Sequence, residues 1–97
     1  MKEDKVKFTL ITGATSGLGK ELAKLFANNN NNLLLVSSNA INLIKTKEEL
    51  SALYPSILID YLCLDLSNIN NFLKLSTYTE SKNYFINYLI NNAGFGD

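Results

Sequence analysis

Apolar residues are grouped in short blocks along the chain, and the spacing within the blocks alternates between two patterns. Four blocks are largely continuous apolar runs, typical of buried parallel strands: Val6–Thr12, Leu33–Val36, Ile57–Leu64 and Phe85–Ile90. The segments between them repeat apolar residues every three or four positions. This spacing predicts helices from Ser16 or Gly17 to about Ala27 and from about Ala40 to Leu53. It also predicts a third helix that Ser67 or Asn68 could cap and that reaches about Thr79.

Each predicted helix carries apolar residues that we expect to face the sheet. They are Leu18, Leu22, Leu25 and Phe26 in the first helix, Leu43, Leu50 and Leu53 in the second, and Ile69, Phe72, Leu73 and Leu75 in the third. The asparagine run Asn28–Asn32 ends the first helix, because asparagine favours turns and tolerates left-handed backbone. Pro55 ends the second helix because it disfavours helical backbone at the preceding residue.

The alternation of strands and helices predicts an α/β domain. Strands that alternate with helices are usually parallel and joined by right-handed crossovers, and the helices cover the faces of the sheet. The carboxyl ends of the strands then share one edge, where ligands bind in open sheets of this class. The chain has 97 residues and no internal repeat, so residues 1–97 are expected to form a single domain.

The stretch Thr12–Gly19 reads Thr-Gly-Ala-Thr-Ser-Gly-Leu-Gly and links the first predicted strand to the first helix. Gly13 permits a sharp turn because glycine adopts positive φ without a steric penalty. Gly17 and Gly19 remove side chains where a backbone approaches closely or a helix packs tightly on a sheet. The free N–H groups and the positive dipole end of the following helix favour an anion, such as a phosphate or pyrophosphate.

Two better-known glycine loops do not match this stretch. A nucleoside-triphosphatase loop requires Gly, four residues, then Gly-Lys-Ser/Thr, but Ala14 and Glu21 occupy two of its positions. The dinucleotide pattern Gly-x-Gly-x-x-Gly has the opposite spacing. Taken alone, a single glycine loop of this kind can also be a purely structural turn.

Composition narrows the possible partners. Hydrophobic residues make up 46% of the chain and charged residues 19%, with a formal net charge of zero. These values indicate a globular domain and no basic surface for nucleic acid. No apolar run approaches the ~20 residues that span a bilayer, and the mixed charges of Met1–Lys5 argue against a signal peptide. Cys63 is the one cysteine, as expected in a reducing compartment, so we expect a cytoplasmic protein.

Three motifs in matching order and spacing change the interpretation of the glycine stretch. They are Thr12–Gly19 after the first strand, Asp65-Leu66 after the third, and Asn91-Asn92-Ala93-Gly94 after the fourth. Together they resemble the short-chain dehydrogenase/reductase family, and the resemblance extends from about Lys5 to Gly96. It implies a Rossmann-like, doubly wound sheet that binds NAD(H) or NADP(H).

The resemblance also implies a role for each matching residue. Gly13, Ser16, Gly17, Leu18 and Gly19 would line the pyrophosphate and the adenosine ribose. Asp65 would accept a hydrogen bond from the adenine amino group, with Leu66 contributing its backbone. Asn91, Ala93 and Gly94 would flank the ribose and the start of the nicotinamide half. Thr12 and Asn92 would brace the first and fourth strands rather than touch the cofactor.

Cofactor preference is where the sequence departs from the family. Members that use NAD carry an acidic residue after the second strand, and members that use NADP carry a basic residue at the next position or before the second glycine. Here Ser37 and Ser38 follow the second strand and Ser16 precedes Gly17. The absent acidic residue gives a slight preference for NADP(H).

The family's catalytic serine, tyrosine and lysine lie beyond the Asn-Asn-Ala-Gly segment, so none can be assigned to this sequence. Tyr78 and Lys82 satisfy the family's Tyr-x-x-x-Lys pattern, but they precede the fourth strand and lie away from the cofactor edge. We expect a solvated helix end there. The chain as given is therefore predicted to be inactive alone.

A complete sheet of this fold has about six strands, and four are predicted here, in the order 3-2-1-4. The first two helices would share one face and the third would cover the other. Strand four would be an edge strand, with Phe85, Tyr88, Leu89 and Ile90 meeting water or a partner, so we expect marginal stability or self-association. Beside an oxidoreductase's cofactor-binding half, two alternatives remain: a non-catalytic binding or interaction module, and a truncated, non-functional reading frame.

Overall fold

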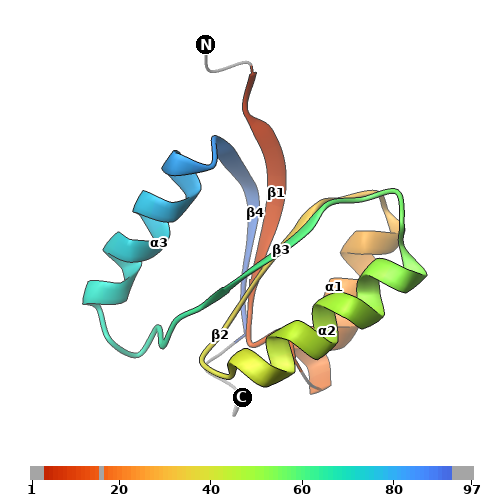
Figure 1. Cartoon of the computed structure of the whole chain (residues 1–97), viewed down its shortest axis with the longest axis horizontal. Helices are drawn as coiled ribbons and strands as arrows, with labels where there is room; N and C mark the ends of the chain where they lie inside the picture. The colour runs from red at the N-terminus through yellow and green to blue at the C-terminus, as the bar shows by residue number, and fades with distance from the viewer. Residues whose placement is uncertain (1–3, 16, 93–97) are drawn as a thin grey trace.

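A four-stranded parallel sheet is the centre of the fold (Figure 1). The computed structural model describes residues 4–15 and 17–92. The strands are β1 (Val6–Thr12), β2 (Leu33–Ser37), β3 (Ile59–Cys63) and β4 (Tyr84–Asn91), and the helices are α1 (Gly17–Asn28), α2 (Ala40–Leu53) and α3 (Asn70–Ser81). The strand order is β3-β2-β1-β4, which confirms the predicted topology.

The helices form two layers around the sheet. Helices α1 and α2 lie on one face and α3 lies on the other, as the sequence predicted (Figure 1). Alternate strand residues supply the two cores, since neighbouring side chains in a strand point to opposite faces. Ile11, Leu33 and Leu35 pack under α1 and α2, whereas Leu34 and Val36 pack on the α3 side. None of the described helices is long and apolar enough to cross a membrane.

Two predicted boundaries shift because hydrogen bonds hold turns next to them. The third strand was expected from Ile57, but β3 begins at Ile59, after a turn in which the Ile57 N–H donates to the Tyr54 carbonyl. Ser67 or Asn68 was expected to cap the third helix, but α3 begins at Asn70 and its N-cap residue is Ile69. The Asn68 carboxamide oxygen accepts the Asn70 N–H at 3.0 Å, so Asn68 does bond the start of the helix.

The predicted apolar face of α1 is wrong for Leu18 and Leu25, whereas Phe26 packs half-buried against the core as expected. The helix turns Gly19, Ala23 and Ala27 to the sheet, while Leu18 is 64% exposed and Leu25 is 59% exposed. The reason is distance: a Cβ atom at Gly19 would lie 1.8 Å from the Gly13 carbonyl oxygen. A helix this close to the sheet has room for small side chains only.

The other two helices also bury fewer apolar residues than predicted. Helix α2 buries Leu43 and Leu50 as expected, but Leu53 is 58% exposed and Thr46 is buried instead. Helix α3 has no buried residue, and Ile69, Phe72 and Leu73 are all exposed. It contacts the sheet through half-buried residues, chiefly Leu75 and Tyr78. The α3 face is therefore the more loosely covered of the two.

The asparagine run joins segments of the amino edge as well as ending α1. Asn30 adopts a φ of 64°, the left-handed conformation that stops a helix. The Asn32 carboxamide donates to the Lys7 carbonyl at 3.0 Å and accepts the Leu58 N–H at 2.8 Å. Asn32 thus connects β1 to the segment that leads into β3.

Replacing Gly19 with alanine tests the close packing of α1. The added Cβ would collide with backbone and with the Asn92 carboxamide, so Gly19→Ala should lower the free energy of unfolding by about 3 kcal/mol. Leu25→Ala, on the exposed side of the same helix, should change it by less than about 0.5 kcal/mol. Urea denaturation measures both; a Leu25→Ala loss as large as the Gly19→Ala loss would contradict this packing.

Candidate functional site

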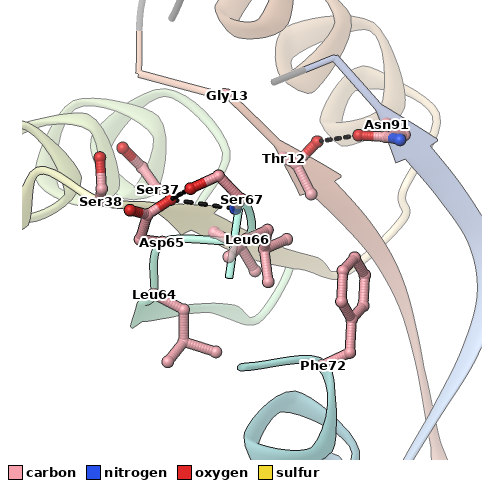
Figure 2. Close-up of a pocket in the computed structure, with 11 residues that line it drawn as sticks. Thr12, Gly13, Ser37, Ser38, Leu64, Asp65, Leu66, Ser67, Phe72 and Asn91 are labelled. Atoms are coloured by element: carbon pink, nitrogen blue, oxygen red, sulfur yellow. Dashed lines mark hydrogen bonds between the residues drawn. The ribbon is translucent and has the colours of Figure 1, made fainter. Parts of the chain in front are cut away.

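The carboxyl ends of all four strands meet at a cleft of about 350 Å³ (Figure 2). Its lining includes these residues at or just beyond the strand ends: Thr12, Gly13, Ser37, Ser38, Asp65, Leu66 and Asn91. Six of them are residues that the sequence singled out for cofactor binding, all but Thr12. Segments that are far apart in the sequence are thus brought to one place. Ser16, Ala93 and Gly94 were also singled out and lie outside the described residues.

The glycines of the turn after β1 differ in what they do. Gly13 lines the cleft, adopts a φ of 63°, and donates its N–H to the Val36 carbonyl at 3.0 Å. Gly17 has a φ of 57°, and a Cβ there would meet nothing within 4 Å. Gly19 lies against the Gly13 carbonyl, so its role is packing. Leu18 does not line the cleft and exposes its side chain.

Thr12 and Asn92 join β1 to β4, as the resemblance implied. The Thr12 hydroxyl oxygen accepts the Asn92 N–H at 2.9 Å, and its own O–H lies 3.0 Å from the Asn91 carboxamide oxygen. The Asn92 carboxamide donates to the Gly13 carbonyl at 3.1 Å. These bonds hold the end of β4 beside the glycine turn and set one wall of the cleft.

The two serines at the end of β2, Ser37 and Ser38, offer hydroxyl groups to the cleft. The Ser37 hydroxyl oxygen accepts the Asn39 N–H at 3.2 Å, which leaves its O–H able to donate to a ligand. Asn39 in turn caps α2, because its side-chain oxygen accepts the Asn42 N–H. The Ser38 hydroxyl bonds to nothing in the described part of the chain, and Ser38 is exposed.

Asp65 is the one charged residue among the described residues that line the cleft. Its Oδ1 atom accepts two hydrogen bonds from Ser67, one from the hydroxyl at 2.7 Å and one from the backbone N–H at 3.0 Å (Figure 2). Both bonds stabilise the carboxylate and hold the pKa of Asp65 below its ordinary value. The side chain therefore stays ionised, and it accepts hydrogen bonds from donors such as amines.

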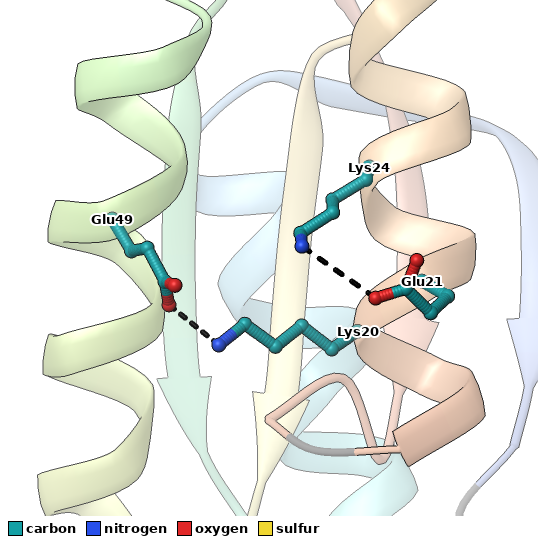
Figure 3. A network of polar contacts seen from close by, with 4 residues as sticks. All are labelled: Lys20, Glu21, Lys24 and Glu49. Carbon is teal, nitrogen blue, oxygen red and sulfur yellow. Dashed lines mark hydrogen bonds and ion pairs between the residues drawn. The ribbon is translucent and has the colours of Figure 1, made fainter.

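No lysine is among the described residues that line this cleft. Lys20, next to Gly19, directs its ammonium group toward α2 and lies 2.6 Å from a Glu49 carboxylate oxygen (Figure 3). The hydrogen bond from Lys20 lowers the pKa of Glu49. Lys24 pairs with Glu21 on the surface of α1. An anion at the start of α1 would thus rely on backbone N–H groups rather than on Lys20.

Sequence reasoning did not place four residues that line the cleft: Val36, Leu64, Ser67 and Phe72. Ser67 was considered as a helix cap, but its hydroxyl bonds Asp65. Phe72 was expected to pack α3 onto the sheet, but it is 52% exposed. The position of Ser67 two residues after an aspartate is a signal that the sequence did contain, because such serines often bond the aspartate in a turn.

The Tyr-x-x-x-Lys pair lies at the opposite edge of the sheet. The Tyr78 hydroxyl donates to Asp60 Oδ2 at 2.6 Å, and the Tyr84 hydroxyl donates to the same oxygen at 2.7 Å. Asp60 and Tyr84 are near the amino ends of β3 and β4. The expected solvated helix end is found at residues 80–82, which are exposed, but not at Tyr78, which is half-buried and hydrogen-bonded. Its distance from the carboxyl edge does agree with the sequence analysis.

The electrostatics of this cluster are the reverse of what a catalytic tyrosine needs. Burial and the hydrogen bond to Asp60 raise the pKa of Tyr78 well above 10, whereas a general base requires a lowered pKa. The Lys82 ammonium lies 5.6 Å from the centre of the Tyr78 ring, not beside its hydroxyl. Burial and Asp60 likewise raise the pKa of Tyr84 to about 12. Burial alone would raise the pKa of Asp60, but the bonds from both tyrosines lower it.

Comparison with known proteins decides the family. The family model described as short chain dehydrogenase matches residues 7–97. The chain belongs to this family. A chloroplastic short-chain dehydrogenase, TIC 32 A of Brassica napus, is 36% identical over 85 residues, and a very-long-chain 3-oxoacyl-CoA reductase of Coccidioides immitis is 36% identical over 92 residues. These alignments cover 88% and 93% of this chain but only 27% and 26% of those proteins.

Solved structures agree on the fold. The NADPH-dependent reductase YwfH, involved in bacilysin biosynthesis, superposes with a TM-score of 0.83 at 28% identity, covering 92% of this chain and 37% of that one. L-sorbose reductase of Gluconobacter frateurii, solved with NADPH and L-sorbose, gives 0.85 at 24% identity, covering 96% and 35%. The chain thus spans about a quarter of the curated relatives and somewhat over a third of these structures. Its fold is the Rossmann-type fold of short-chain dehydrogenases.

The Asp60 cluster makes stability depend on alkaline pH. A tyrosine with a raised pKa retains its proton longer in the folded chain, so its contribution is complete below pH 10 and is lost as the pH rises through the folded value, about 12 for Tyr84. Tyr84→Phe should lower the free energy of unfolding at pH 7 by about 1 kcal/mol and reduce its decline between pH 10 and 12 to roughly half.

Tyr88→Phe is the matched control, since Tyr88 lies on the same strand with its side chain exposed. It should leave both the stability at pH 7 and the alkaline decline unchanged. Urea denaturation at several pH values gives the comparison. If Tyr84→Phe and Tyr88→Phe behave alike, the bond from Tyr84 to Asp60 does not contribute as described.

Proposed function

We propose that the cleft binds a nicotinamide dinucleotide, NADP(H) or NAD(H), as the cofactor-binding part of a short-chain dehydrogenase. The observation that carries the proposal is the convergence of Gly13, Ser37, Ser38 and Asp65 from three strand ends on one cleft. In open parallel sheets this edge is where nucleotides bind. Family membership and the relatives named for NADPH support it.

The groups around the cleft fit the parts of a dinucleotide. Gly17 leaves open space at the start of α1, where the first-turn N–H groups lack helical partners and suit a pyrophosphate. The hydroxyls of Ser37 and Ser38 suit the adenosine ribose. Asp65 suits the adenine amino group, because an ionised carboxylate accepts from an N–H donor. In this proposal the backbone of Leu66 lies beside the adenine, and Asn91 lies on the side of the nicotinamide half. Leu18 and Gly19 shape the start of α1.

The reaction proposed for the whole protein is hydride transfer between the nicotinamide ring and a carbonyl or alcohol carbon, the chemistry that such a cofactor supplies. The described residues offer the binding half of that chemistry. In this proposal they hold and orient the dinucleotide. Tyr78, which matches the Tyr-x-x-x-Lys pattern, lies at the opposite edge of the sheet. No catalytic residue is assigned.

Within this proposal NADP(H) is favoured slightly over NAD(H). No carboxylate follows β2, so nothing at Ser37 or Ser38 would repel a 2′-phosphate, and both hydroxyls can donate to it. No cation lines the described part of the cleft either. The expected preference is accordingly small.

Titration of NADPH with its fluorescence as the signal tests the proposal. The chain should bind NADPH and raise its fluorescence, and Ser38→Arg should tighten NADPH by about tenfold with little effect on NADH, because guanidinium pairs with the 2′-phosphate. Ser56→Arg adds the same charge at an exposed site near the amino edge and should change neither affinity. No fluorescence change at millimolar NADPH would refute binding.

A second proposal concerns partners: the chain self-associates through β4. This strand lies at the end of the sheet and carries no charged residue, so a second copy can pair along it without like-charge repulsion. Phe85 is 50% exposed, Tyr88 52% and Leu89 63%, whereas Ile90, also expected at the surface, is half-buried under the α1 face. An exposed, uncharged edge strand also favours the alternative hypothesis that the chain is an interaction module.

Sedimentation velocity across a hundredfold concentration range tests this association. The wild-type chain should shift from monomer to dimer, with a melting temperature that rises with concentration. Leu89→Lys should remain monomeric, because a charged edge disfavours pairing. A wild-type monomer with a sharp, concentration-independent melt would contradict the proposal.

We also propose a reducing compartment, with the cytoplasm as the simplest case. The single cysteine, Cys63, is exposed and forms no disulfide in the described structure.

A further inference from the structure

The turn after β3 is held by hydrogen bonds to both the side chain and the backbone of Asp65. Besides the two bonds from Ser67 to Asp65 Oδ1, the Asp65 carbonyl accepts the Asn71 carboxamide at 2.7 Å and the Asn68 N–H at 3.3 Å. Asn71 belongs to the first turn of α3. Side chain and backbone of Asp65 are therefore both fixed before any ligand arrives.

The two carboxylate oxygens of Asp65 differ in the hydrogen bonds that they accept. Oδ1 accepts two donors, while Oδ2 accepts none from the part of the chain that the structure describes. Figure 2 shows the carboxylate between Ser67 and the two serines at the end of β2, Ser37 and Ser38. Oδ2 is thus the acceptor that remains for a ligand, and Ser67 determines which way it points.

We propose that Ser67 is a positioning residue that makes the cleft select adenine over hypoxanthine, through its two hydrogen bonds to Asp65. This inference rests on the proposed dinucleotide site. Adenine presents an amino group at its 6 position, which donates to Oδ2. Hypoxanthine presents a carbonyl oxygen at the same position, and two acceptors facing each other repel.

The inference predicts how the base preference changes when the acceptor is changed. In Asp65→Asn the two Ser67 donors hold the amide oxygen, so the amide NH₂ group must face the base. That variant should then favour hypoxanthine, because its NH₂ donates to the 6-oxo oxygen. A side chain free to rotate would present either end and show little preference.

The test compares Kd for NADPH with Kd for its deamino analogue, reduced nicotinamide hypoxanthine dinucleotide phosphate, by fluorescence titration. Wild type should favour NADPH by about tenfold, the effect of one hydrogen bond to a charged group. Ser67→Ala should reduce the ratio to about twofold. Ser67→Thr, which keeps the hydroxyl, should restore it, and the remote Ser56→Ala should leave it unchanged.

Asp65→Asn should reverse the ratio, and the double variant Asp65→Asn with Ser67→Ala should lose the reversal. A destabilised loop would weaken both dinucleotides together and leave their ratio in place, so the ratio separates positioning from folding. If Ser67→Ala keeps the wild-type ratio, or wild type binds both dinucleotides equally, the inference is overturned while dinucleotide binding stands. If wild type binds neither dinucleotide, the proposed function fails and the inference fails with it.

Discussion

The close approach of α1 to the glycine turn is the constraint on which the rest of the structure depends. A side chain at Gly19 would overlap the Gly13 carbonyl oxygen and come within 2.6 Å of the Asn92 carboxamide. At Gly19 the start of α1 therefore packs directly against the turn after β1 and the end of β4. Because they meet there, the first helix points its free N–H groups at the edge where the other strands end.

Hydrogen bonds from short polar side chains fix the other turns at the carboxyl edge of the sheet. Thr12 and Asn92 hold β4 beside β1, Asn39 caps α2 next to Ser37, and Ser67 orders Asp65. Each bond fixes a turn at the carboxyl edge, where loops would otherwise lose entropy on binding a ligand. The cleft is therefore largely preorganised, although α3, which forms one of its walls, buries no residue of its own.

Topology was predictable from the sequence because it follows from the alternation of strands and helices and from three motifs in register. The buried face of α1 was not, since hydrophobicity ranks Leu18 and Leu25 above the small residues that the close contact demands. The hydrogen bonds of the Asp60 cluster could not be predicted from the sequence either. Its two tyrosines come from α3 and β4 and contact Asp60 only in the folded sheet. Most residues at the edge of the cleft could be predicted, because the strand ends of a parallel sheet share one edge. Ser67 and Phe72 could not be assigned to the cleft from the sequence, because their positions depend on how the loop after β3 and helix α3 are placed.

The most direct test of the central claim, that the carboxyl edge holds the dinucleotide, is a map of backbone amide chemical shifts with and without NADPH. The account predicts that changes concentrate at Gly13, at Ser37 and Ser38, at residues 65–67 and at Asn91. Amides of the amino edge, such as those of Asn32 and Leu58, should not move. Changes centred on the amino edge, or none at the carboxyl edge at saturating NADPH, would contradict it.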